Sequence, residues 1–161
     1  MTIYTIKPLG TDTWDAFARL IERQGNGSMG APFCWCTNFH PPDPDDNRSS
    51  EGRRAYKEQL VSQGRAHAAL VFDGDLAVGW CQYGSPEELP GIHHRKDYEA
   101  GLVTLPHYRL TCIYVDKAYR KRGVAAAALQ GALDLIGNAG GGVVEGYPHD
   151  IPEGKKMSAS F

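Results

Sequence analysis

Hydrophobic residues recur along this chain with the period of a helix in three places,. The first predicted helix begins after Thr11 or Asp12, the second begins at Ser49 or Ser50 and stops at Gly64, and the third covers about residues 124–136,. The charged side chains on the second helix are expected to face solvent: Arg53, Arg54, Lys57 and Glu58. The predicted apolar faces are Trp14, Phe17, Ala18 and Ile21 in the first helix and Ala55, Tyr56, Leu60 and Val61 in the second.

Runs with the character of β-strands lie between these helices. Asp73-Gly74 separates two of the runs and marks a hairpin, because such a turn requires a positive φ angle,. The near-continuous apolar run at Tyr108–Val115 predicts a strand buried on both faces, and the helix after it places the last strand parallel to it. Residues 25–47 are predicted to be irregular, and residues 84–106 form a long polar insertion,. The predicted strands are Thr2–Pro8, Ala66–Phe72, Leu76–Tyr83, Tyr108–Val115 and Val143–Tyr147.

The composition fits one domain of mixed α/β (α+β) class covering residues 1–161. With 17.6 kDa and 42% hydrophobic residues, the chain is long enough to bury a single core,. A formal net charge of −2 gives no reason to expect nucleic acid or an anionic membrane as a partner,. No segment approaches the roughly 20 apolar residues of a membrane helix. The cysteines do not suggest a disulfide scaffold, so we expect a cytoplasmic protein; they are Cys34, Cys36, Cys81 and Cys112,.

A short basic loop, RKRGVA at Arg120–Ala125, separates the strand at Tyr108–Val115 from the third helix. The first N–H groups of a helix lack intrahelical partners and carry the positive end of its dipole, so they favour an anion. Gly123 allows a positive φ angle and a close approach to the backbone. These features together predict a phosphate-binding loop, although a solvated basic turn is the alternative on charge alone.

The order strand, R-x-x-G-x-A and helix resembles the acyl-CoA signature of the GNAT superfamily of N-acyltransferases. Arg120, Gly123 and Ala125 fill the defined positions of that signature. The resemblance implies a mostly antiparallel central sheet flanked by helices and splayed between Tyr108–Val115 and Val143–Tyr147. It implies acetyl-CoA as co-substrate, with pantetheine along the first of these strands and pyrophosphate on the loop. The implied donor-binding residues are Ile113, Tyr114, Val115, Arg120, Lys121, Arg122, Gly123, Val124, Ala125 and Ala126.

The resemblance also implies direct transfer of the acyl group to a primary amine of a small molecule, peptide or protein. The attacking amine must be neutral, so the site needs a base or a water chain. Many members of the family carry a glutamate on the strand before the loop, but this chain has none between Tyr108 and Val115. Glu145, His107 and Tyr147 are the nearest substitutes. A module that binds or senses acyl-CoA without catalysis is the alternative function.

Cys34-Trp35-Cys36 is the second distinctive element of the sequence. With His40 it could supply three zinc ligands, but no compact group completes a four-ligand site, so we expect no metal. A metal or thiol-redox protein built on Cys34 and Cys36 is therefore the weakest of the functional hypotheses. A buried loop with Trp35 in the core is the simplest interpretation. In the layout that the resemblance implies, this region forms one wall of the acceptor pocket; the lining candidates are Phe33, Trp35, Cys36 and Phe39.

The end of the sequence departs from the layout of the family. A GNAT domain normally continues with a further helix and a final strand pair, whereas only residues 148–161 follow the last predicted strand. We therefore expect either that the chain continues beyond Phe161 or that a partner, such as a second copy in a homodimer, completes the sheet. The first is favoured, because a long exposed sheet edge promotes aggregation.

Overall fold

Five strands form one sheet in the computed structural model of the chain, which describes residues 2–25, 34–147 and 153. Their order in the sheet is their order in the sequence, and neighbouring strands are antiparallel up to the fourth. The fifth strand runs parallel to the fourth, as the helical crossover predicts,. The strands are β1 (Thr5–Pro8), β2 (His67–Asp73), β3 (Leu76–Gly84), β4 (Tyr108–Val115) and β5 (Val144–Gly146).

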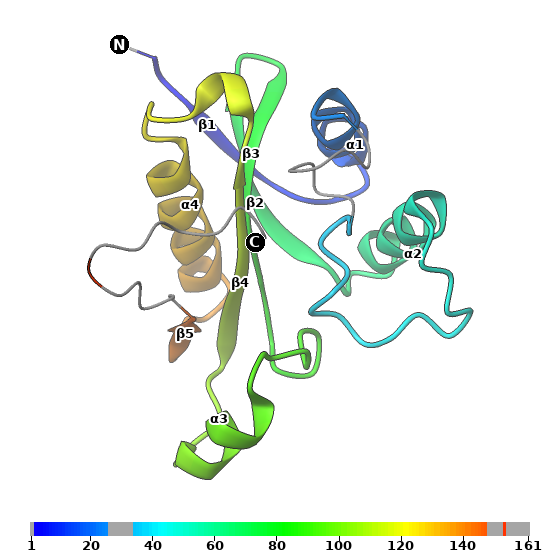
Figure 1. Cartoon of the computed structure of the whole chain (residues 1–161). Helices are drawn as coiled ribbons and strands as arrows, with labels where there is room; N and C mark the ends of the chain where they lie inside the picture. The colour runs from blue at the N-terminus through cyan, green and yellow to red at the C-terminus, as the bar shows by residue number, and fades with distance from the viewer. Residues whose placement is uncertain (1, 26–33, 148–152, 154–161) are drawn as a thin grey trace.

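Helices cover both faces of this sheet (Figure 1). α1 (Trp14–Arg23) and α2 (Ser50–Ser62) lie on one face, and α4 (Val124–Asn138) lies on the other. The helix α3 (Arg95–Gly101) and the 3₁₀ turn η1 (Lys117–Tyr119) lie in the connections on either side of β4. The mixed α/β fold expected from the sequence is confirmed.

The strands divide the hydrophobic core into two halves, because their side chains alternate between the two faces. Leu70 and Trp80 pack with Phe17 of α1 in one half. Val71 and Cys81 pack with α4 in the other. α4 lies very close to the sheet at Gly79, where an added Cβ atom would be only 2.7 Å from Cγ1 of Val124.

The start of α2 follows the prediction, but its buried face does not. Ser49 is the N-cap, and its hydroxyl accepts a hydrogen bond from the Gly52 N–H at 3.0 Å,. The prediction that Lys57 faces solvent is wrong: this side chain is buried, with an exposed fraction of 1%. Ala55 is exposed instead of buried. The helix is therefore rotated so that Lys57 joins Leu60 and Val61 on the inner face.

Burial of β4 also differs from expectation. Most of its residues are only half-buried, and Ile113 has an exposed fraction of 46%. The pairing of β3 with β4 shifts between Gln82 and Tyr83, which leaves Thr111 as an extra residue on β4,. The apolar run marks a strand, but it is not covered on both faces.

Two local predictions need correction. The insertion at residues 84–106 contains α3, which its polar sequence did not predict. α1 is capped by Thr13 and not by Thr11 or Asp12. The Thr13 hydroxyl makes no capping hydrogen bond; it donates to the Pro8 carbonyl at 2.8 Å and accepts from the Gly10 N–H at 2.9 Å. Among the helices of the described residues, none combines the length and the apolar character needed to cross a membrane.

Candidate active site

β4 and β5 pair over only a short stretch. The paired residues are Tyr108 with Val144, Arg109 with Glu145, and Leu110 with Gly146. From Cys112 to Val115, the described residues provide β4 with a strand partner on the β3 side alone. The outer backbone edge at Ile113–Val115 is thus left for another extended group, such as an amide-containing ligand chain.

The loop after β4 has the backbone form that its sequence predicts. Gly123 has a φ angle of 80° and forms the N-cap of α4 without a side-chain hydrogen bond to the helix. Lys121 also has a positive φ angle, of 61°. The first hydrogen bond of the helix joins the Ala127 N–H to the Gly123 carbonyl at 3.0 Å. Helix geometry therefore leaves the N–H groups of residues 124–126 available to an anion.

Side chains of the predicted donor-binding loop divide into two groups. Val124 is buried against β3, so only its backbone is available for binding. The other loop residues expose their side chains at the start of α4: Arg120, Lys121, Arg122, Ala125 and Ala126. The small alanines leave the helix end open, and three exposed cations lie in the loop that precedes it.

Hydrogen bonds fix the segment between β4 and this loop. Arg23 of α1 forms a 2.8 Å ion pair with Asp116, whose other oxygen accepts a 2.9 Å hydrogen bond from the Ala118 N–H. Burial acts to raise the pKa of Asp116, but these hydrogen bonds outweigh it and lower the pKa below its ordinary value,. Gln24 accepts hydrogen bonds from the Tyr114 hydroxyl and the Lys117 N–H, each at 3.0 Å. The loop is therefore held in place before any ligand binds.

Glu145 lies on β5 beside β4 and binds two tyrosines. Its Oε2 atom accepts hydrogen bonds from Tyr98 at 2.8 Å and from Tyr147 at 3.1 Å. Burial is the main cause that raises the pKa of Tyr147 well above its ordinary value, so this phenol stays protonated and donates,. Tyr98 comes from α3 and was not predicted from the sequence. The Arg109 guanidinium lies 5.5 Å from the centre of the Tyr98 ring.

The third catalytic candidate, His107, lies apart from this hydrogen-bonded group. It is exposed, and its Nδ1 atom accepts a 2.9 Å hydrogen bond from the Val143 N–H. That bond ties the start of β4 to the segment before β5. The arrangement thus brings Glu145 and Tyr147 together and gives His107 a role in positioning β5.

A cavity of about 370 Å³ adjoins the Glu145 group. It is lined by the segment after β3, by α3 with Tyr98, by the segment after α3 and by Arg109 of β4. Its walls carry the carboxylates of Glu87 and Glu99, the guanidinium groups of Arg95 and Arg109, and the apolar side chains of Leu102 and Leu105. Arg95 and Glu99 form a 2.7 Å ion pair. The cavity is therefore partly apolar and carries charges of both signs.

The sequence profile of the Acetyltransferase (GNAT) family matches residues 35–145. This chain belongs to the GNAT acetyltransferase family. No curated protein matches the chain. The matched region contains β4, the RKRGVA loop and Glu145, whereas Tyr147 lies just beyond its end.

Solved acetyltransferase structures share the fold of this GNAT domain at low sequence identity. The aminoglycoside N-acetyltransferase AAC(6')-Iy in complex with CoA is 18% identical with a TM-score of 0.56, over 95% of this chain and 80% of that chain. The ribosomal-protein-alanine N-acetyltransferase from Brucella melitensis biovar Abortus 2308 is 16% identical with a TM-score of 0.54, over 94% and 84%. The aminoglycoside acetyltransferase meta-AAC0020 from an uncultured soil metagenomic sample is 11% identical with a TM-score of 0.53, over 93% and 80%.

The Cys34-Trp35-Cys36 segment of this GNAT domain packs into the core. Trp35 and Cys36 are almost completely buried, with exposed fractions of 1% and 2%, and Trp35 stacks on Trp14 with ring centres 6.1 Å apart. Of the predicted pocket residues, Phe39 is half-buried against His93, and Phe33 lies outside the described residues. Trp35 and Cys36 therefore anchor the loop in the core, and their side chains are not accessible to a substrate.

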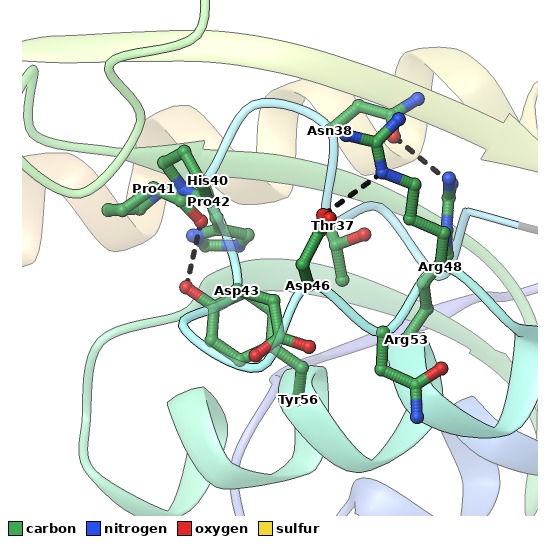
Figure 2. Close-up of a pocket in the computed structure, with 11 residues that line it drawn as sticks. Thr37, Asn38, His40, Pro41, Pro42, Asp43, Asp46, Arg48, Arg53 and Tyr56 are labelled. Carbon is green, nitrogen blue, oxygen red and sulfur yellow. Dashed lines mark hydrogen bonds and ion pairs between the residues drawn. The ribbon is translucent and has the colours of Figure 1, made fainter.

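A second cavity, of about 310 Å³, is lined by the segment that follows, from Thr37 to Arg48, and by α2 (Figure 2). Hydrogen bonds link its walls: Arg53 donates to Asn38 at 3.2 Å, and Tyr56 donates to the Pro41 carbonyl at 2.8 Å. Arg48 and Asp46 form an ion pair at its rim. The cavity is polar and carries charges of both signs.

Lys57 is the centre of a buried polar network that connects this cavity with β4. Its ammonium group donates to His40 Nε2 at 2.8 Å, to Gln82 Oε1 at 2.5 Å and to the Cys36 carbonyl at 3.3 Å. Gln82 in turn donates to the hydroxyl of Thr111, the extra residue of β4, at 3.0 Å. Burial lowers the pKa of Lys57 below its ordinary value,. Within residues 2–25, 34–147 and 153, no set of three or more His, Cys, Asp or Glu side chains is placed to hold a metal ion.

Proposed function

We propose that this protein transfers an acetyl group from acetyl-CoA to a primary amine of a small molecule or peptide. The observation that carries the proposal is the combination of a β4 edge without a strand partner among the described residues and an open start of α4 preceded by three cations, in a member of the GNAT family. Extended amide chains pair with strand edges, and phosphates bind at helix N-termini. Both halves of the CoA molecule thus have a complementary partner in adjacent elements.

The proposed binding site for the acetyl-CoA donor consists of residues that the sequence analysis predicts to bind it. The amide groups of pantetheine would pair with the backbone of Ile113–Val115. The pyrophosphate would accept hydrogen bonds from the N–H groups of residues 124–126, with the charges of Arg120, Lys121 and Arg122 around it,. The solved structure of AAC(6')-Iy with CoA supports the choice of donor, because it combines this fold with that ligand.

Glu145 is proposed as the group that removes the proton from the amine. The neutral amine attacks the thioester carbonyl, a C–N bond forms, the C–S bond breaks, and the CoA sulfur leaves as a thiolate that takes up a proton. Glu145 is the carboxylate beside the point where β4 and β5 separate. Tyr98 and Tyr147 hold it by two hydrogen bonds, which fixes its orientation while one oxygen remains able to accept a proton.

The acceptor is proposed to be a cationic primary amine. The cavity beside Tyr98 carries Glu87, a carboxylate that can attract a protonated amine, and apolar side chains that suit its carbon skeleton, while Glu99 is paired with Arg95,. The similar proteins are named as acetyltransferases of aminoglycosides and of a ribosomal-protein alanine, and both acceptors contain amines. Nucleic acid and membrane are not proposed as partners.

Release of free thiol from acetyl-CoA in the presence of a panel of amines tests this function. Wild-type protein should accelerate the release with at least one polyamine, amino sugar or peptide. Binding of acetyl-CoA without acceleration by any amine would instead favour the sensing module, which the absence of a glutamate on β4 would then explain.

Replacement of the proposed base gives a sharper test. Glu145→Gln should lower kcat by about a hundredfold or more, since general base catalysis typically contributes that much, and should leave acetyl-CoA binding unchanged. Glu58→Gln, an exposed carboxylate on α2, serves as the matched control and should retain full activity. Equal turnover by the two variants would remove Glu145 from the mechanism.

A further inference from the structure

Two cysteine sulfurs from distant parts of the chain lie in direct contact. Cys36 precedes α2 and Cys112 lies on β4, yet their Sγ atoms are 3.1 Å apart. Both are free thiols, and a disulfide bond would require the sulfurs to approach by only about 1 Å more,. The Cys36 thiol donates the hydrogen bond, so Cys112 is the acceptor of the pair.

One positive charge, that of Lys57, lies next to this pair. Lys57 donates to the Cys36 carbonyl, and its three hydrogen-bond acceptors are all neutral groups. The hydrogen bond from Cys36 is the main cause that lowers the pKa of Cys112 below its ordinary value, against the opposing effect of burial, and the charge of Lys57 acts in the same direction. Cys112 is therefore the thiol of the pair that ionises first, and a thiolate is the nucleophile in disulfide formation.

Cys34 provides access from the solvent. It is partly exposed, whereas Cys36 is buried. The Cys36 thiol has one proton; when it donates to Cys34 in place of Cys112, that hydrogen bond is the main cause that lowers the pKa of Cys34 to about 6, and the charge of Arg53 contributes. An accessible thiolate next to a second thiol is the arrangement found in cysteines that react with peroxides.

We propose that Cys34, Cys36 and Cys112 form a peroxide-oxidised thiol relay that ends in a disulfide between Cys36 and Cys112. Cys34 is the entry point, Cys36 is the shared partner, and Cys112 is the final acceptor. The disulfide would join the loop before α2 to β4 immediately before Ile113. The inference concerns the thiols alone and stands whether or not the protein acetylates amines.

The chemistry balances with hydrogen peroxide as the oxidant. The Cys34 thiolate attacks one peroxide oxygen, which gives a sulfenic acid and hydroxide. The Cys36 thiol then attacks the Cys34 sulfur, an S–S bond forms, and the sulfenic oxygen leaves as water with the thiol proton. Finally the Cys112 thiolate attacks the Cys36 sulfur and releases Cys34 as a thiolate. Two thiols lose two electrons in total, and one peroxide becomes two molecules of water.

Mass spectrometry of the intact, folded chain tests the relay. The reduced protein is treated with hydrogen peroxide, blocked with a thiol reagent and digested without reduction. A linked peptide pair containing Cys36 and Cys112 is expected, with two of the four thiols lost and then recovered with dithiothreitol. A final disulfide between any other pair, or oxidation of Cys34 to sulfinic acid with no disulfide, would overturn the proposal.

Single variants separate the roles of the three thiols. Cys34→Ser should slow formation of the Cys36–Cys112 disulfide by about tenfold or more, because the accessible thiolate is lost. Cys81→Ser is the matched control: Cys81 is fully buried in the core half that packs on α4, and its loss should leave the rate unchanged. An unchanged rate in Cys34→Ser, with circular dichroism equal to wild type, would show that no relay operates. Thiols that resist peroxide until a bound metal ion is removed would equally contradict it.

Discussion

His40 is held in a single protonation state by its two partners. Its Nδ1–H donates to the Glu88 carbonyl at 3.1 Å, so Nε2 carries the lone pair that accepts from Lys57,. Burial is the main cause that lowers the pKa of His40 to about 3, and the charge of Lys57 adds to it. In the unfolded chain the imidazole takes up a proton near pH 6.5. In the folded chain it stays neutral until the pH falls to about 3. The folded state therefore loses stability as the pH falls through this window, by up to about 5 kcal/mol.

Urea unfolding of wild type and His40→Gln at pH 7 and pH 4.5 measures this contribution. The variant should be less stable at pH 7, since Lys57 loses a well-placed acceptor. The difference in unfolding free energy should shrink at pH 4.5, because glutamine binds no proton in the unfolded chain. Carboxylates titrate in both proteins and cancel in the comparison. A difference that stays constant with pH would show that His40 has the same pKa in the folded and the unfolded chain.

The burial of Lys57 in this network could not be predicted in full from the sequence. Lys57 was assigned to the solvent because lysines are rarely buried without a partner. Its spacing from Leu60 and Val61 places all three on one face, and that signal was present in the sequence,. The acceptors that make burial tolerable, His40 and Gln82, come from other elements, and only the folded chain brings them to Lys57.

At the scale of elements, the contact between α4 and β3 depends on the absence of a side chain at Gly79. A Cβ atom there would lie 2.7 Å from Val124 Cγ1 and 2.8 Å from the Tyr114 carbonyl oxygen. Gly79→Ala should therefore lower the free energy of unfolding by about 1–3 kcal/mol, as expected for overpacking. Gly137→Ala, near the exposed end of α4 with nothing within 4 Å, should raise it by up to about 1 kcal/mol,. Urea unfolding of both variants measures these changes. An unchanged free energy of unfolding in Gly79→Ala would mean that α4 shifts freely on the sheet.

Elements were predictable to the extent that their own residues determine them. The hairpin and the cap at Ser49 are local features, and both occur; the turn is made by Gly74 and Asp75, because Asp73 still pairs with Leu76. Burial of β4 depends on its neighbours: β5 pairs with it only as far as Leu110, so an apolar run ends up half-exposed. α3 is short, polar and lacks buried residues, so the sequence contains no periodic pattern of apolar residues that would predict it. Tyr98 was missed together with α3.

At the scale of the whole molecule, ligand binding and folding are linked, so acetyl-CoA should raise the melting temperature. Saturation at a hundred times Kd adds about 2.7 kcal/mol of stability to a protein that binds only when folded. The RKRGVA loop lies between β4 and α4. Arg23 and Gln24, at the end of α1, hold the segment before the loop through an ion pair and two hydrogen bonds. Little ordering is then needed on binding, which favours a large shift.

Two loop variants distinguish backbone binding from charge attraction in that shift. Gly123→Val adds a branched side chain at a φ angle of 80° and beside the N–H groups of α4, so Kd for acetyl-CoA should rise by about tenfold or more,. Lys121→Ala removes one exposed charge of three and keeps a non-glycine residue at the same φ angle of 61°, so Kd should rise only a few-fold,. Calorimetric titration gives both constants, and the melting temperature without ligand reports the strain that Gly123→Val adds to the fold. Equal and small losses in the two variants would mean that the cations hold the pyrophosphate and that the start of α4 does not.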